Sequence, residues 1–162
     1  MSKLYVDEIQ PKTAGGVVAM PTKPSFFAAN NANAWQSFGN TNWNTFPFNA
    51  TRVNVGNHYD TSNYRFTAPI TGPYYFYMQY LHDGTSTTSY GEARFQKTTS
   101  GGAVTHPAFA HNSVQGDTVI LATIVDLQVN DYVEAQGRVG NTNADDWYAI
   151  DYYANFCGYF IG

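Results

Sequence analysis

The residues most suited to chemistry lie in a short acidic stretch near the C-terminus, NADDWYAID at 143–151. Carboxylate oxygens are the ligands that Ca²⁺ prefers, so Asp145, Asp146 and Asp151 are candidate calcium ligands. Their spacing follows no known calcium-binding loop, however, and a solvated turn between two strands explains the same residues. We therefore expect no bound cofactor or metal, and calcium at these three aspartates remains the alternative.

Catalytic residues are not expected. Paired carboxylates for glycoside cleavage must flank one bond, but the adjacent Asp145 and Asp146 point in different directions. Ser113 lacks the Gly-x-Ser-x-Gly setting of a nucleophile, and Cys157 lies among aromatic residues without a neighbouring base. The histidines lack the spacing of a metal site or catalytic pair and are expected in loops or at strand edges: His58, His82, His106 and His111. We predict that the protein is not an enzyme.

Aromatic rings beside amide side chains form a second group of candidates, because exposed Trp and Tyr can stack on sugars. The stretches at 33–44 and 145–153 combine such rings with Asn and Gln, and most of these rings are assigned to core and subunit contacts. The candidates for receptor contact are the loop members Trp43 and Trp147, together with Tyr90 in the polar loop DGTSTTSYG.

The elements that must hold these residues are strands. From Pro24 onward, turn signals alternate with runs rich in aromatic and β-branched residues, and no segment shows a sustained helical period. This pattern predicts an all-β, two-sheet β-sandwich of about eight strands, at 25–30, 45–55, 64–68, 73–82, 91–98, 117–128, 131–139 and 154–161.

The run YYFYMQYLH, at 74–82, is apolar or amphipathic on both faces of its strand. Alternation places one set of side chains toward the core and the other set on the opposite face, which carries Tyr75, Tyr77, Gln79 and Leu81. Such a strand is either central in a sandwich or covered on its second face by another subunit.

Composition excludes several partners. The net charge is −4 and the few Lys and Arg residues do not cluster, so nucleic-acid binding is not expected. No run of about 18 apolar residues occurs, which excludes a membrane-spanning helix. The start MSKLYVDEIQ lacks the features of a secretory signal and the single cysteine permits no internal disulfide, so we expect the chain to be made in a cytoplasm.

Several motifs in the chain carry a resemblance to a known family. Phe-x-x-Pro followed by Gly-x-Tyr-x-Phe is formed here by Phe66, Pro69, Gly72, Tyr74 and Phe76, and the chain ends on an aromatic motif formed by Phe156, Gly158, Tyr159, Phe160 and Ile161. Between them, LQVNDYVEAQ has Asn130 and Asp131 in place of a Gly-Asp pair. In this order the motifs resemble the C1q head domain, which shares a trimeric jelly roll with the tumour necrosis factor family. The resemblance implies a homotrimeric jelly roll over residues 24–162.

The first 23 residues form a separate segment, an extended strap that is expected to pack on another chain. LYVDEIQPKTAGGVV resembles a segment that opens fibre and particle-surface proteins of marine bacteriophages. The residues expected to anchor the strap to a virion are Leu4, Tyr5, Val6 and Ile9.

Together these observations predict a non-enzymatic structural protein of a phage virion, located on the particle after synthesis in the host cytoplasm. Its strap would dock to capsid or tail proteins, and its trimeric head would attach to a host-surface glycan or protein. Two alternatives remain: a capsid decoration or cement protein without a host ligand, and a bacterial C1q-like binding module.

Overall fold

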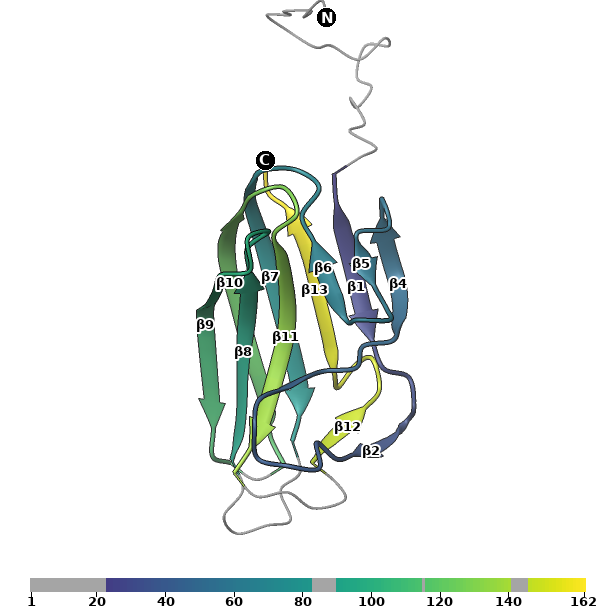
Figure 1. Cartoon of the computed structure of the whole chain (residues 1–162). Helices are drawn as coiled ribbons and strands as arrows, with labels where there is room; N and C mark the ends of the chain where they lie inside the picture. The colour runs from purple at the N-terminus through teal and green to yellow at the C-terminus, as the bar shows by residue number, and fades with distance from the viewer. Residues whose placement is uncertain (1–22, 83–89, 115, 141–145) are drawn as a thin grey trace, which may run out of the picture.

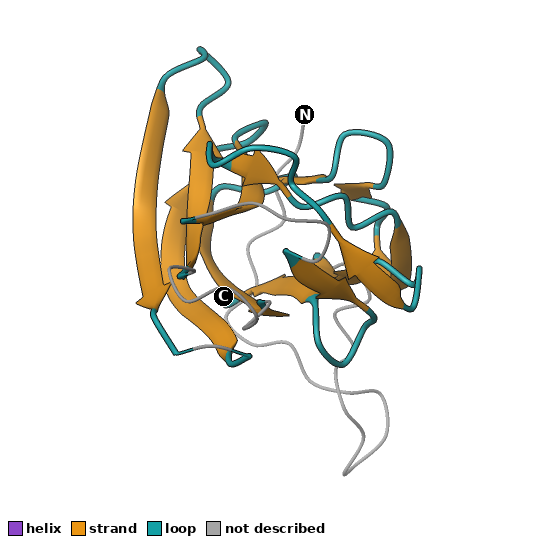
Figure 2. Cartoon of the chain, turned by 90° about the horizontal axis from the view of Figure 1, so that it is seen from below, coloured by secondary structure: helices purple, strands orange, loops and turns teal. Residues whose placement is uncertain are grey.

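The computed structural model describes residues 23–82, 90–114, 116–140 and 146–162, and these form strands and connections without a helix. Figure 1 shows two main sheets packed face to face, and Figure 2 shows, from below, how their strands surround one interior. The all-β sandwich predicted from the alternation of strand and turn signals is thereby confirmed.

The first sheet has five antiparallel strands in the order β10-β7-β13-β1-β4. Its strands are β1 (Ser25–Ala29), β4 (Ala50–Val55), β7 (Gly72–Leu81), β10 (Thr118–Leu127) and β13 (Asn155–Phe160). Strand β7 alternates as predicted: Tyr74, Phe76, Met78 and Tyr80 are fully buried, whereas the residues between them are half-buried. One face of this sheet therefore forms the core, and the other is open in the isolated chain.

The second sheet has six strands, with β5-β6-β11-β8-β9 in order and β3 paired to β11. Its strands are β3 (Asn44–Thr45), β5 (Tyr59–Asp60), β6 (Arg65–Thr67), β8 (Gly91–Thr98), β9 (Val104–Asn112) and β11 (Tyr132–Val139). Strand β9 forms an exposed edge, and its register with β8 shifts between Phe95 and Lys97. An irregular edge of this kind is a poor template for pairing with another chain.

A small third sheet closes the end of the sandwich opposite the C-terminus (Figure 1). It pairs β2 (Ala34–Gln36) with β12 (Trp147–Ala149), and His82 forms an isolated bridge to Trp147. The Trp147 ring meets Phe46 edge to face, with centroids 5.1 Å apart. This sheet therefore caps the core with a large ring.

The core between the main sheets is built largely from aromatic rings. Phe26 lies 5.0 Å from Phe66 in a stacked arrangement and 4.7 Å from Phe156 edge to face, measured between ring centroids. Both geometries suit the charge distribution of aromatic rings. The buried rings come from strands of both sheets, so their packing holds the two layers together.

The turn before β7 and the turn before β11 show why their motifs have the observed residues. Gly72 has φ 144°, a conformation that L side chains rarely adopt, and the Tyr74 hydroxyl donates to the Ile70 carbonyl at 2.8 Å. Asn130 has φ 69°, in the left-handed region where Asn substitutes for Gly. Asp131 is buried and accepts hydrogen bonds from the backbone N–H groups of Ser100 and Gln128, each at 3.0 Å.

Several strand predictions need correction. The run at 45–55 is not one strand, because Pro47 lies between β3 and β4 and cannot donate to a ladder. Strands β2, β5, β9 and β12 were not expected. The C-terminal strand β13 is central in its sheet, but only one of its faces is buried: Phe156 is fully buried, whereas Tyr159 is 50% exposed.

Candidate functional site

The open face of the five-stranded sheet is the first candidate surface, and we call it the aromatic face. Alternation along its strands turns every second side chain away from the core. The outward side chains that define the aromatic face are uncharged and half-buried or exposed: Phe27, Val53, Tyr75, Tyr77, Ile120, Ile124, Cys157 and Tyr159.

Strand register makes the aromatic face continuous. One row across neighbouring strands runs from Phe27 through Cys157 and Tyr77 to Ala122. In the next row, Tyr159 and Tyr75 have ring centroids 5.4 Å apart, and Ile124 follows on β10 with 61% of its surface exposed. Apolar groups in register over several strands form a contiguous patch, which is typical of a protein contact surface.

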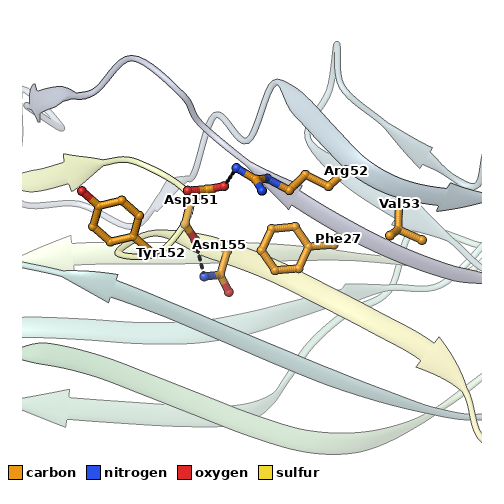
Figure 3. A pocket seen from close by; sticks show the side chains of 6 residues that line it. All are labelled: Phe27, Arg52, Val53, Asp151, Tyr152 and Asn155. Atoms are coloured by element: carbon orange, nitrogen blue, oxygen red, sulfur yellow. Dashed lines mark hydrogen bonds and ion pairs between the residues drawn. The ribbon is translucent and has the colours of Figure 1, made fainter.

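A groove of about 840 Å³ lies at the β4 side of this face (Figure 3). Phe27 and Val53 line it, together with Tyr152 and Asn155. Arg52 and Asp151 form an ion pair across it, and Asn155 Nδ2 donates to the Asp151 carbonyl oxygen at 2.7 Å. Because Phe27 and Val53 belong to both, the groove and the aromatic face are one surface.

The outer face of the six-stranded sheet has a different character. Trp43, which directly precedes β3, lies against two cations: the guanidinium carbons of Arg94 and Arg138 are 4.2 and 4.8 Å from its ring centroid. Phe109, 56% exposed on β9, meets Trp43 edge to face at 6.1 Å. We call Trp43, Arg94, Arg138 and Phe109 the Trp43 site.

A hydrogen-bonded layer fixes the Trp43 site from below. Glu92 is 6% exposed although it points to the outer side of the sheet, where it pairs with Arg138 Nε and lies 3.1 Å from His111 Nδ1. Gln136, 7% exposed, accepts the Arg94 Nε–H at 2.8 Å. Buried polar partners of this kind limit the rotamers of the two arginines, so the site is organised before any ligand arrives.

The two arginines of the Trp43 site lie close enough to perturb each other. Burial lowers the pKa of Arg94, and the nearby Arg138 lowers it further. The pKa of His106 is likewise lowered, first by burial and then by Arg94. Since arginine stays protonated at neutral pH, both guanidinium groups carry charge.

The structure separates the three predicted receptor contacts. Trp43 is half-buried in the Trp43 site, and Tyr90 lies next to that site, with its ring centroid 5.2 Å from that of His111. The prediction for Trp147 is wrong, because its side chain is 1% exposed in the core. The short strand β12 turns Trp147 inward and leaves Tyr148, its neighbour, half-exposed. Asp83 to Ser89 of the polar loop lie outside the described residues.

The calcium candidates do not come together in the described part of the chain. Asp145 lies outside it. Asp146 is buried and accepts hydrogen bonds from the Ser37 hydroxyl at 2.8 Å and the Phe38 N–H at 2.6 Å, which ties β12 to the segment after β2. Asp151 is ion-paired with Arg52. No group of three or more His, Cys, Asp or Glu suited to a metal occurs among the described residues.

One expectation for the histidines was wrong: His82 is fully buried at the end of β7 and is not an edge histidine. His111 lies on the edge strand β9, as expected, and meets Glu92 because the antiparallel pairing of β8 and β9 places the two residues opposite each other. The arginines of the Trp43 site were also missed. The alternation of polar residues in GEARFQKT and YVEAQGRV could have indicated an outward polar row, but the position of Trp43 over it depends on long-range pairing.

The anchoring residues Leu4, Tyr5, Val6 and Ile9 lie outside the described residues. Within the described part of the chain, no helix is long and apolar enough to cross a membrane.

Comparison with known proteins agrees with the geometry. The family model described as C1q domain matches residues 25–161. The globular domain of zebrafish complement 1qA protein is similar in structure, with TM-score 0.64, 17% identity, and coverage of 86% of this chain and 98% of that one. Murine APRIL at pH 8.0 gives TM-score 0.66 at 12% identity, covering 86% of this chain and 99% of that one. No curated protein sequence matches. The chain belongs to the C1q domain family.

Proposed function

We propose that this protein is a non-enzymatic attachment head that works as a homotrimer on the surface of a bacteriophage particle. Residues 1–23 dock the head to capsid or tail proteins, the aromatic face joins three subunits, and the Trp43 site meets a molecule of the host surface. The chain's membership of the C1q domain family supports a binding or structural module. The phage setting rests on the resemblance of the strap.

The aromatic face is the observation that carries the proposal. Its exposed members include Ile120, Ile124 and Tyr159, which are 55%, 61% and 50% exposed in the isolated chain. A contiguous apolar surface of this kind is costly in water, and burial stabilises by about 25 cal/mol per Å². A neighbouring subunit that covers this face and fills the groove at Phe27 and Val53 removes that cost.

The Trp43 site supports attachment as the task of the head. It lies on the sheet opposite the aromatic face, so self-association leaves it accessible. The C-terminal half of β11, which carries Gln136 and Arg138, runs toward the end of the sandwich opposite the C-terminus, whereas β1 enters beside the C-terminus (Figure 1). The Trp43 site therefore lies toward the end of the sandwich opposite the start of β1. In the proposed arrangement it would face away from the particle.

Three copies of a weak site on one head can bind a repetitive surface far more strongly than one copy, by about 10² to 10⁴-fold. Attachment therefore does not require a deep pocket. The shallow, partly exposed Trp43 site is suited to such weak individual contacts.

The proposal is tested with the full chain and with a variant that lacks residues 1–23. We expect light scattering to give the mass of a trimer for both proteins at micromolar concentration, which for the full chain is three times 18.0 kDa. Antibodies against the head should label phage particles assembled with the full chain but not particles assembled with the shortened chain. A monomeric full chain, or equal labelling without the strap, would contradict the proposal. Fragile particles together with a trimer that ignores host cells would indicate a cement protein instead.

A further inference from the structure

We propose that the Trp43 site binds an acidic polysaccharide built from uronic acids, with Arg94 holding the carboxylate and the exposed ring of Phe109 packing against the sugar. This inference rests on the proposed function and names the ligand class of the same site. It follows from the different partners of the two arginines and from the charges around them.

Arg94 and Arg138 lie over the same indole but differ in what else they bind. Arg138 is neutralised by the buried carboxylate of Glu92. Arg94 is held by an uncharged group, Gln136 Oε1, 2.8 Å from its Nε, and no ion pair with a carboxylate involves Arg94 in the described part of the chain. Its charge is therefore available to an anionic ligand.

The way in which Arg94 is held suits a carboxylate. A guanidinium group presents five N–H donors in a planar fork, and the bond to Gln136 occupies the Nε–H alone. The two terminal nitrogens can then donate side by side to both oxygens of one carboxylate. Trp43, 4.2 Å from the guanidinium carbon, and Gln136, whose Nε2 donates to Thr45 Oγ1 at 3.4 Å, limit the movement of the fork. Little side-chain entropy is then lost on binding.

The sugar ring has a surface beside that fork. Phe109 is directly opposite Arg94 in the pairing of β8 with β9, and its ring is 56% exposed. The C–H groups on one face of a pyranose are weakly positive, so they pack on the electron-rich face of an aromatic ring. A carboxylate attached to that pyranose lies within a few ångströms of the ring, which matches neighbouring positions on paired strands.

The surrounding charges favour a polymer with one carboxylate per sugar over a densely charged one. The outer face of the same sheet also carries Glu92 and Glu134. The whole chain has net charge −4. A polyphosphate or nucleic acid would bring many negative charges against these carboxylates, and the few cations here cannot offset them.

The test uses two probes, an oligomer of galacturonic acid and the same oligomer with its carboxyl groups methyl-esterified. We expect the full-length trimer to bind the free acid at least about tenfold more tightly, a difference of about 1.4 kcal/mol, in isothermal titration calorimetry. Arg94→Gln should remove this preference, and Phe109→Ala should weaken binding to both oligomers. Equal binding of the two oligomers, or no binding of either at millimolar concentration, would overturn the proposal.

Arg65→Gln is the matched control, because Arg65 also lies over a ring of the same sheet, 4.4 Å from the centroid of Tyr132. It should retain the preference for the free acid. A thermal melt of each variant identifies any loss of folding, and the exposed Phe109 provides a variant that leaves the arginines in place. If Arg94→Gln heads adhere to host cells as well as the unaltered protein does, the ligand class is wrong while the attachment function stands. If the chain is monomeric and does not adhere, yet still prefers the free acid, the attachment function is wrong while the ligand class stands.

Discussion

Ile124→Glu should convert the proposed homotrimer into folded monomers. Ile124 is 61% exposed at the β10 side of the aromatic face, so the isolated sandwich accepts a glutamate there at little cost. In the trimer the same side chain would be covered by a neighbouring subunit. An unpaired carboxylate buried in this way costs about 3 to 5 kcal/mol, and each trimer would contain three.

The combined cost is about 9 kcal/mol or more, which weakens the overall association constant by about 10⁶-fold or more. Sedimentation velocity at micromolar concentration should then show a single species with the mass of one chain, and circular dichroism should show an unchanged sandwich. Because the cost comes from charge, it should shrink as the pH falls and the carboxyl group becomes neutral, so that trimers return near pH 4.

Val104→Glu is the matched control, since Val104 is 50% exposed on β9 in the other sheet. It should leave the trimer intact. A variant Ile124→Glu that remains fully trimeric at neutral pH would refute the assignment of the aromatic face, as would dissociation by Val104→Glu alone.

Two predictions concern the stability of the sandwich. Burial would raise the pKa of Asp131, but the N–H groups of Gln128 and Ser100 and the ammonium group of Lys97, 3.2 Å away, lower it overall. The ionised Asp131 therefore stabilises the fold above the unfolded pKa of about 3.9, and this contribution is lost as the pH falls through the lower folded value. Asp131→Asn should lower the free energy of unfolding by about 1 to 3 kcal/mol at pH 7, measured with urea, and should reduce the loss of stability in acid. An unchanged loss of stability in acid would contradict this assignment. Gly158→Ala should destabilise by about 1 to 3 kcal/mol in the same assay, because its Cβ would lie 2.6 Å from the Phe76 ring and 2.8 Å from the Tyr75 carbonyl oxygen, whereas Gly162→Ala meets nothing within 4 Å and should be neutral.

The parts of the fold that could be predicted are those in which one strand carries its own signal. In β7, strict alternation separates the buried Tyr74 and Phe76 from the half-buried Tyr75 and Tyr77, so both the strand and its faces follow from local sequence. Strand β9 has no such signal, because VTHPAFAHN is an edge strand in which every residue is exposed or half-buried and Pro107 interrupts the run. Its existence depends on pairing with β8, which is a tertiary contact.

The candidate site shows the same division. Trp43 and Tyr90 were chosen as candidates from ring type and polar surroundings, which are local properties. Trp147 has similar neighbours in the sequence, yet pairing of β12 with β2 directs it into the core. Arg94 and Arg138 form a site only because β8, β11 and the segment before β3 lie next to one another. The spacing of these residues along the chain does not predict that contact.

The two ends of the sandwich domain lie side by side: the Phe160 N–H donates to the Pro24 carbonyl at 3.0 Å, and the Ile161 N–H donates to that of Pro73 at 3.0 Å. Chain ends this close can be joined by a short linker, so the domain is suited to circular permutation. New ends opened in the turn between β9 and β10 would emerge at the opposite end of the sandwich (Figure 1). A docking segment attached there would hold the same domain in the opposite orientation, so that the Trp43 site would face the surface to which the segment is proposed to dock.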